Sequence, residues 1–186
     1  FAKIMRGVGC RVLGYDVSPD AELSQEIGIE YRSLPEVLAS SDIISLHVPL
    51  NTQTRHVLDA KALAGMKRGV MIINTGRGAL IDTPALVEAL KTGQVGAAGL
   101  DVYEEEEGVF FEDHSGEVLA DEQLAWLLMC PNVMVTSHQA FLTKEALERI
   151  ATTTLGSLTQ LEAELHGGPR VEEDQKTVLA ALGQGR

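Results

Sequence analysis

The sequence is poor in cysteine and aromatic residues and has no long apolar run. Its two cysteines, Cys10 and Cys130, lack the close spacing of metal-binding or redox-active pairs, so we expect a reduced, cytoplasmic setting. No apolar stretch approaches the roughly 20 residues that a membrane-spanning helix needs, and no charged-then-apolar leader stands at the start. Aromatic residues form only 4% of the chain and hydrophobic residues 45%, a balance typical of an aliphatic α/β core.

Positive charge is also scarce, with 15 lysine and arginine residues against 27 aspartate and glutamate residues and a net charge of -12. Nucleic acids and anionic membrane surfaces attract basic proteins, so we expect neither as a partner. The other four histidines show no metal-ligand spacing relative to His138, and we expect no metal site. A length of 186 residues is enough for one hydrophobic core, or for one domain with a piece of another.

Short apolar segments of strand length alternate with segments of helical character. The predicted strands cover residues 42–48, 70–74, 97–101 and 133–136, and the predicted helices cover 59–66, 83–91 and about 121–129. This alternation, with little linker between elements, predicts an α/β fold with a doubly wound parallel sheet of the Rossmann type. The near-continuous apolar strand at 42–48 further suggests that helices cover both faces of the sheet.

From Thr143 onward the pattern changes to one long amphipathic helix. Apolar residues recur every three or four positions for more than twenty residues, or about 35 Å at 1.5 Å per residue. Such a helix needs more apolar surface than a single sheet edge offers, so we expect it to cross to another domain or subunit. We therefore divide the chain into an α/β domain at residues 1–142, the long helix at 143–167 and a weakly ordered tail at 168–186.

Three polar groups follow predicted strands, at the edge where open α/β sheets bind ligands. They are Arg77, the acids that begin at Asp101, and His138. A fixed cation, a carboxylate and an imidazole can together hold and protonate an oxo acid. The glycines on either side of Arg77 would let the backbone approach a ligand closely.

Each of these residues also has an ordinary structural explanation. Arg77 could form a surface ion pair, and His138 could be a histidine of the core. The four consecutive glutamates at 104–107 are typical of a solvated loop, and spacing alone does not decide which of them turns inward. Asp101, at the strand end itself, is better placed to meet a cofactor.

Asp16 ends a short predicted strand at residues 11–16. In dinucleotide-binding folds an acid at this place binds the adenosine ribose, about 20 residues after a glycine-rich turn. No such turn precedes Asp16 in the sequence, so we expect it upstream of Phe1, in a longer protein. Residues 17–19 contain no arginine, which favours NAD over NADP. The alternative is that Asp16 is a turn or helix-capping residue.

Five segments resemble the D-isomer-specific 2-hydroxyacid dehydrogenases. They are residues 47–50, 71–82, 99–106, 107–115 and 137–143, and the similarity extends from Phe1 to about Leu165. Within the family, the segments at 110–115 and 138–143 are most similar to the fermentative D-lactate dehydrogenases. The resemblance implies that residues 1–142 are an NAD-binding domain, truncated before its glycine-rich loop. It also implies that the helix at 143–167 belongs to, or packs on, a substrate domain.

The resemblance also implies roles for individual residues. Arg77 would bind the substrate carboxylate, His138 would donate the proton, and Glu106 would be the carboxylate paired with His138. The residues that it implies for NAD binding are Asp16, Val48, Pro49, Thr54, Thr75, Gly76, Arg77 and Asp101.

The implied reaction is pyruvate plus NADH giving D-lactate plus NAD, so the expected partner is a small-molecule substrate. We expect the full-length protein to be a homo-oligomer, either a dimer or a tetramer. Residues 1–186 alone should bind NADH weakly and be inactive, because the family builds part of its catalytic pocket from an N-terminal segment. Two alternatives stay open: another 2-oxo acid reductase, acting on hydroxypyruvate, glyoxylate or a branched acid, and an NADH-sensing binding protein on the same scaffold.

Overall fold

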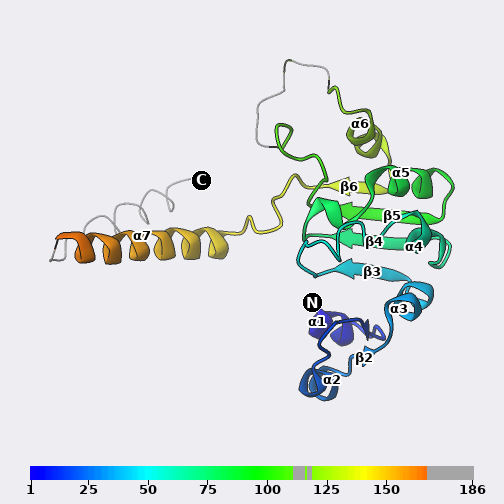
Figure 1. The fold of residues 1–186 in the computed structure, drawn as a ribbon, viewed down its shortest axis with the longest axis horizontal. Helices are drawn as coiled ribbons and strands as arrows, with labels where there is room; N and C mark the ends of the chain where they lie inside the picture. The colour runs from blue at the N-terminus through cyan, green and yellow to red at the C-terminus, as the bar shows by residue number, and fades with distance from the viewer. Residues whose placement is uncertain (111–115, 117–118, 167–186) are drawn as a thin grey trace. The chain divides into compact units, whose positions relative to one another are not determined.

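The computed structural model describes residues 1–110, 116 and 119–166. The chain divides into two compact units, Phe1–His138 and Gln139–Arg186. The first unit contains every described strand, and the second contains one long helix (Figure 1). The predicted tail at 168–186 and residues 111–115 of the D-lactate-like segment lie outside the described residues.

A four-stranded parallel sheet forms the centre of the first unit (Figure 1). Its strands, in spatial order, are β3 (Ile43–Leu46), β4 (Val70–Asn74), β5 (Val95–Leu100) and β6 (Val133–Val135). The register pairs Leu46 with Asn74, Asn74 with Leu100, and Leu100 with Val135. All four strands therefore end on one row, and the predicted parallel α/β fold is confirmed.

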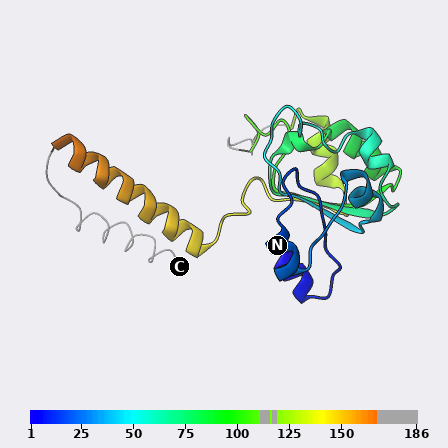
Figure 2. The ribbon, with the colours of Figure 1, turned by 60° about the horizontal axis from the view of Figure 1, so that its bottom comes forward.

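Three helices cover one face of this sheet. They are α4 (Ala60–Ala64), α5 (Thr83–Lys91) and α6 (Glu122–Met129), and they pack side by side (Figure 2). The core between helices and sheet is aliphatic, and its largest fully buried side chains include Leu58, Leu63, Ile72, Leu80, Leu86, Leu124 and Leu127. As a result, the inward positions of each strand are the ones that hold the helices in place.

The opposite face of the sheet differs from the sequence prediction. Ile43 and Met71 adjoin buried residues in their strands and Met134 adjoins half-buried ones, yet the three are 44%, 39% and 67% exposed. The expectation that helices cover both faces is therefore not met at these positions in the described part of the chain. The apolar character of a strand does not say which elements cover it.

A second, two-stranded parallel sheet consists of β1 (Leu13–Gly14) and β2 (Glu30–Tyr31). Helices α1 (Ala2–Gly7), α2 (Ala21–Ile27) and α3 (Leu34–Ser40) accompany it in the sequence. The sequence prediction missed α2 and β2 and made β1 longer than it is.

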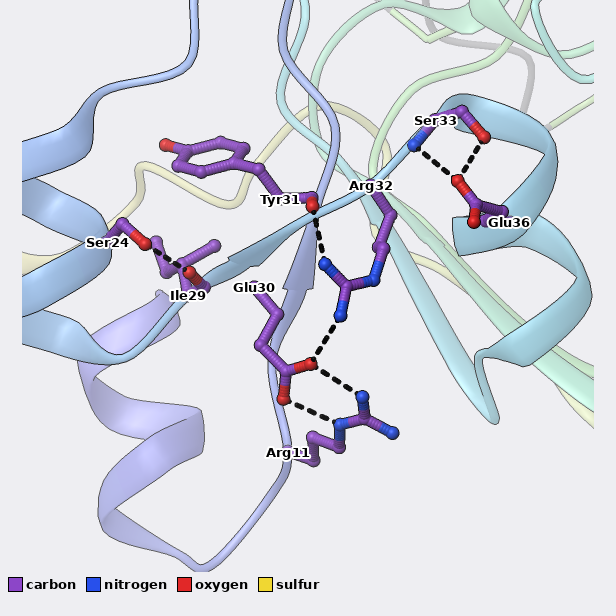
Figure 3. A network of polar contacts seen from close by, with 8 residues as sticks. All are labelled: Arg11, Ser24, Ile29, Glu30, Tyr31, Arg32, Ser33 and Glu36. Atoms are coloured by element: carbon purple, nitrogen blue, oxygen red, sulfur yellow. Dashed lines mark hydrogen bonds and ion pairs between the residues drawn. The ribbon is translucent and has the colours of Figure 1, made fainter.

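Local signals explain why α2 and α3 begin where they do. Asp20 accepts hydrogen bonds from the backbone of Glu22 and Leu23, and Gly28, at φ +76°, ends α2. At the start of α3, the backbone N–H and the hydroxyl of Ser33 both donate to Glu36 (Figure 3). These two bonds form the capping box of α3.

The second unit contains α7 (Lys144–His166). The Thr143 hydroxyl accepts a hydrogen bond of 3.1 Å from the Ala146 backbone, as the predicted helix start requires. Apolar side chains on this helix remain exposed, Ile150 at 51% and Leu158 at 57% among them. Among the described residues of this unit, 139–166, nothing covers the apolar stripe of the helix.

Gly78 lies where two backbone segments of the first unit meet. It begins the 3-10 turn η1 (Gly78–Leu80), directly after Arg77. A Cβ atom at this position would lie 2.0 Å from the carbonyl carbon and oxygen of Tyr103 and 2.4 Å from the backbone nitrogen of Glu104. The sequence suggested that this glycine permits close approach to a ligand, but the close approach is to the protein's own backbone.

We expect Gly78→Ala to lower the free energy of unfolding by more than about 2 kcal/mol, because neither backbone can move without disturbing the loops that follow β4 and β5. Gly65→Ala is the matched control. Gly65 has φ -80°, and the nearest atom to its Cβ position is 3.5 Å away, so this change should stay within about 0.5 kcal/mol. Urea unfolding followed by circular dichroism measures both, and equal midpoints would contradict the expected backbone clash.

Candidate functional site

The residues that directly follow the four strands lie along one edge of the sheet. Because the strands end in register, the four residues that follow them share this row: His47, Thr75, Asp101 and Thr136. The row continues the ladder, since the Asp101 N–H donates to the Asn74 carbonyl (2.9 Å) and the Thr136 N–H to that of Leu100 (3.0 Å). Such an edge is the usual ligand site of open parallel sheets.

Asn74 shapes the loop that carries Arg77. Its side chain is 1% exposed, donates to the Arg77 carbonyl (2.9 Å) and accepts from the Gly76 N–H (3.0 Å). The exposed Arg77 guanidinium donates one bond to the Gly76 carbonyl (2.8 Å), and its fork has five donors in all. Sequence reasoning missed Asn74, although an asparagine just before a Thr-Gly turn is a known turn signal.

An open pocket of about 590 Å³ lies along this edge. Its lining combines five predicted residues, Val48, Pro49, Thr75, Gly76 and Arg77, with Leu46, His47 and Leu50. Aliphatic walls with one guanidinium suit a molecule that has a flat apolar ring system and negative charge, as a dinucleotide does. The residues present therefore fit NAD.

His47 was not predicted as a pocket residue, although it opens one of the segments on which the family resemblance rests. Its Nε2 atom lies 2.9 Å from the Ser45 hydroxyl, and its ring centroid lies 5.1 Å from that of Phe1. Partial burial lowers the pKa of His47. Burial in this pocket therefore favours the neutral form of the His47 ring.

His138 and Glu106 form a direct pair. The Nδ1 atom of His138 lies 3.0 Å from Oε1 of Glu106, while the other carboxylate oxygen accepts the Tyr103 N–H at 3.1 Å. The His138 backbone N–H donates to the Asp101 carbonyl (2.5 Å). Ser137 and His138 have φ of +50° and +57°, which non-glycine residues adopt only when their surroundings impose it. The structure therefore selects Glu106 from the acidic run as the partner of His138.

The remaining predicted residues lie around this centre. Asp101 is 4% exposed, and its carboxylate accepts a 2.5 Å bond from the Thr136 hydroxyl. The Thr54 hydroxyl donates to the Pro49 carbonyl (2.6 Å), so Thr54 shapes the segment after β3 without lining the pocket. Asp16, also outside the pocket lining, follows the smaller sheet and accepts a bond from the Ser18 N–H (2.8 Å). This is the turn geometry of the alternative explanation, and it leaves the ribose role of Asp16 untested.

The residues directly after Asp16 contain no arginine, but the fold brings Arg32 near β1. The Arg32 N–H donates to the Gly14 carbonyl of β1 (2.9 Å). Its guanidinium is occupied by the Glu30 carboxylate (3.2 Å) and the Tyr31 carbonyl (3.1 Å), and Glu30 also binds Arg11 (Figure 3). The bonds from Arg11 hold the pKa of Glu30 below its usual value. The sequence analysis did not find Arg32, because only the pairing of β1 with β2 places it beside Gly14.

Glu104 binds Arg55, His56 and Thr83, a set of partners that Glu106 does not share. Its side chain is 10% exposed, and Oε1 lies 2.9 Å from Nη2 of Arg55 and 2.6 Å from Nε2 of His56. The other oxygen accepts the Thr83 N–H at 3.4 Å. Burial by itself would raise the pKa of Glu104, but the bonds from His56 and Thr83 and the charges of His56 and Arg55 together lower it.

Tyr103 anchors the same segment on its other side. Its hydroxyl donates to Asp121 (2.7 Å), the residue that caps the N-terminus of α6, and its ring lies 6.2 Å from that of Phe110. Burial and this hydrogen bond raise the pKa of Tyr103, so the phenol stays protonated. The segment that leads to Glu106 is therefore held at two successive residues, Tyr103 and Glu104.

Among residues 1–110, 116 and 119–166, no group of three His, Cys, Asp or Glu side chains is arranged to hold a metal ion. In the same part of the chain, no helix is both long enough and apolar enough to span a membrane.

We expect Glu104→Gln to lower the free energy of unfolding at pH 7 by about 1–3 kcal/mol, because charge-assisted bonds to Arg55 and His56 become neutral ones. Since folding lowers the pKa of Glu104, its stabilisation is complete above the ordinary value of 4.5 and is lost as the pH falls through the folded-state pKa. The two proteins should therefore converge in urea titrations as the pH falls below the folded-state pKa of Glu104. Glu105→Gln, at the exposed neighbouring glutamate, is the control, and a stability loss of equal size there would contradict the prediction.

Comparison with known proteins gives one consistent family. The sequence profile described as "D-isomer specific 2-hydroxyacid dehydrogenase, NAD binding domain" matches residues 1–140. The chain is 49% identical over 160 residues to a D-lactate dehydrogenase of Escherichia coli strain K12, covering 86% of this chain and 48% of that protein. The chain therefore spans about half the length of such relatives.

Solved structures agree in fold and in sequence. One, described as the pyruvate reductase of Chlamydomonas reinhardtii, has a TM-score of 0.78 and 49% identity, covering 82% of this chain and 47% of its own. The D-lactate dehydrogenase of Aquifex aeolicus, complexed with NAD and lactic acid, has a TM-score of 0.77 and 36% identity, covering 89% and 49%. Profile, sequence and fold agree: the chain belongs to the D-isomer-specific 2-hydroxyacid dehydrogenase family, and residues 1–140 carry its NAD-binding domain.

Proposed function

We propose that the full-length protein carrying this chain reduces pyruvate to D-lactate with NADH. The observation that carries the proposal is the His138–Glu106 pair, with 3.0 Å between Nδ1 and Oε1, on the sheet edge that also carries Arg77. The pyruvate reductase and D-lactate dehydrogenases among the relatives support pyruvate over other 2-oxo acids.

Arg77 binds the substrate carboxylate. Its loop is rigid because the buried Asn74 holds it at two backbone atoms, and one guanidinium N–H is already fixed by the Gly76 carbonyl. The remaining N–H groups can form two parallel bonds to a carboxylate, which fix the orientation of the carbonyl next to it. A lysine ammonium group could not form these two parallel hydrogen bonds.

His138 donates the proton. With Nδ1 directed at Glu106, the opposite nitrogen, Nε2, is the atom that meets the substrate carbonyl oxygen. As the carbonyl carbon accepts a hydride, its oxygen accepts this proton, and the product is a hydroxy acid. The negative Glu106 holds the ring in position and balances its charge, and acid catalysis of this kind contributes about 10²–10⁴ in rate.

NADH, when bound, supplies the hydride. We assign its adenosine end to Asp16, Val48 and Pro49, with Thr54 holding the turn beside them. Thr75, Gly76 and Asp101 lie near the Arg77 loop, and we assign them to the nicotinamide end. The pocket that joins Val48 and Pro49 to Thr75 and Gly76 supports this order.

We further propose how the domains divide. Residues 1–142 are the NAD-binding domain, the helix at 143–167 belongs to or packs on a substrate domain, and the exposed apolar stripe of that helix supports such a contact. The full-length protein acts in the cytoplasm as a dimer or tetramer. Residues 1–186 alone bind NADH weakly and do not reduce pyruvate, because the chain spans about half the length of its relatives.

In the full-length protein, we expect pyruvate to be reduced to D-lactate faster than hydroxypyruvate, glyoxylate or 2-oxoisocaproate. His138→Ala and Arg77→Ala should each lower kcat/KM by at least about 100-fold, because proton transfer or substrate orientation is lost. NADH oxidation with chiral analysis of the product measures both expectations.

Arg68→Ala is the matched control for the Arg77 variant. Arg68 precedes β4 at the opposite sheet edge and donates to the Thr92 carbonyl, so its loss should leave kcat/KM within about 2-fold. Preference for a branched or hydroxylated 2-oxo acid would overturn the substrate assignment. Tight NADH binding with no turnover on any of the four acids would overturn the catalytic assignment and favour an NADH-sensing role.

A further inference from the structure

The polar cluster around Glu104 lies outside the residues assigned to proton transfer, yet it joins three segments of the site. Glu104 follows β5 and lies two residues before Glu106. Its carboxylate reaches Arg55 and His56, in the turn after β3, and the Thr83 N–H at the start of α5. Two residues, Val102 and Tyr103, separate Glu104 from Asp101, which directly follows β5.

The turn that Glu104 holds is itself tightly constrained. His56 has φ +50°, a left-handed conformation that costs free energy in a non-glycine residue. Its N–H donates to the Ala79 carbonyl in η1 (2.8 Å), so the turn is tied to the segment directly after Arg77. Two residues earlier, Thr54 binds the Pro49 carbonyl at the wall of the pocket.

Glu104 also limits where Glu106 can lie. The backbone of Tyr103 and Glu104 is pressed against Gly78, and the Tyr103 N–H binds the Glu106 carboxylate. A shift of Glu104 toward solvent would move this N–H and change the distance from Glu106 to His138. The nearly buried carboxylate opposes such a shift, because an outward movement would break its bonds to Arg55, His56 and Thr83.

From these contacts we propose that Glu104 is a positioning residue, which holds the turn after β3 that contains Thr54 and the segment that contains Glu106 in one arrangement. NADH affinity and proton transfer then depend on the same carboxylate. The proposal rests on the proposed reduction of a 2-oxo acid for its kinetic consequence. It does not require that Glu104 touch substrate or cofactor. The exposed Glu105, with no such cluster, provides the internal comparison.

The test uses the full-length protein with four variants: Glu104→Gln, His56→Asn, their combination, and Glu105→Gln as the control. Asparagine tolerates positive φ, so His56→Asn removes the imidazole without adding backbone strain. We expect Glu104→Gln to lower kcat by about 10- to 100-fold, since small displacements of reacting groups have effects of that size. The NADH dissociation constant should rise at least 3-fold, and Glu105→Gln should change neither quantity by more than 2-fold.

The double variant tests whether one contact underlies both effects. If Glu104 acts through His56, the combined loss in kcat will be smaller than the product of the two single losses. A spectroscopic measurement separates positioning from simple destabilisation. The proton NMR signal of the His138 Nδ1–H, bonded to Glu106, should be lost or shifted in Glu104→Gln at a temperature where the protein is fully folded, and unchanged in Glu105→Gln.

The proposal is overturned if Glu104→Gln matches Glu105→Gln in kcat, NADH affinity and the His138 signal. Losses in the single variants that simply multiply would also overturn it, because they would show two separate contacts. If the wild-type protein reduces no 2-oxo acid, the proposed function fails. NADH affinity and the His138 signal then still decide the role of Glu104.

Discussion

The shared register of β3 to β6 is the constraint on which the site depends. Leu46, Asn74, Leu100 and Val135 are paired across the sheet, so the segments that follow them leave it at one edge. Parallel strands need crossover connections, and α4, α5 and α6 provide cover for one face while returning the chain to the far edge. A slip of one residue in β4 would turn Ile72 and Asn74 toward the opposite face, removing both the core contact and the support of the Arg77 loop.

Buried polar side chains convert this edge into a rigid site. Asn74, Asp101 and Glu104 are each nearly buried, and each is bonded to neighbouring backbone or side-chain groups. An unpaired polar group in such a place costs free energy, so each loop keeps the one conformation that satisfies its bonds. His56 and His138 have a left-handed backbone, which isolated chains would avoid. The His56 side chain binds Glu104, and the His138 N–H binds the Asp101 carbonyl.

Much of the fold around the site could be predicted because its signals are local. The observed bounds of β4 and α5 coincide with the predicted ones, since an apolar run marks the strand and Asp82, Pro84 and Gly93 mark the helix. In contrast, α2 contains no buried residue, so its sequence has no apolar face from which the helix could be predicted. The pairing of Arg32 with Gly14 could not be foreseen either, because β2 was not predicted.

The sequence by itself determined the fold class, the strand ends after which Arg77, Asp101 and His138 stand, and, through the family resemblance, the NAD cofactor. These follow from apolar periodicity and from motifs that lie within a few residues of one another. Only the tertiary structure decided that Gly78 makes room for Tyr103. It also turned Glu104 toward His56, whereas the family resemblance had already implied the pairing of Glu106 with His138. Four consecutive glutamates are equivalent as a sequence, and they become different only when packing gives each side chain a different neighbour.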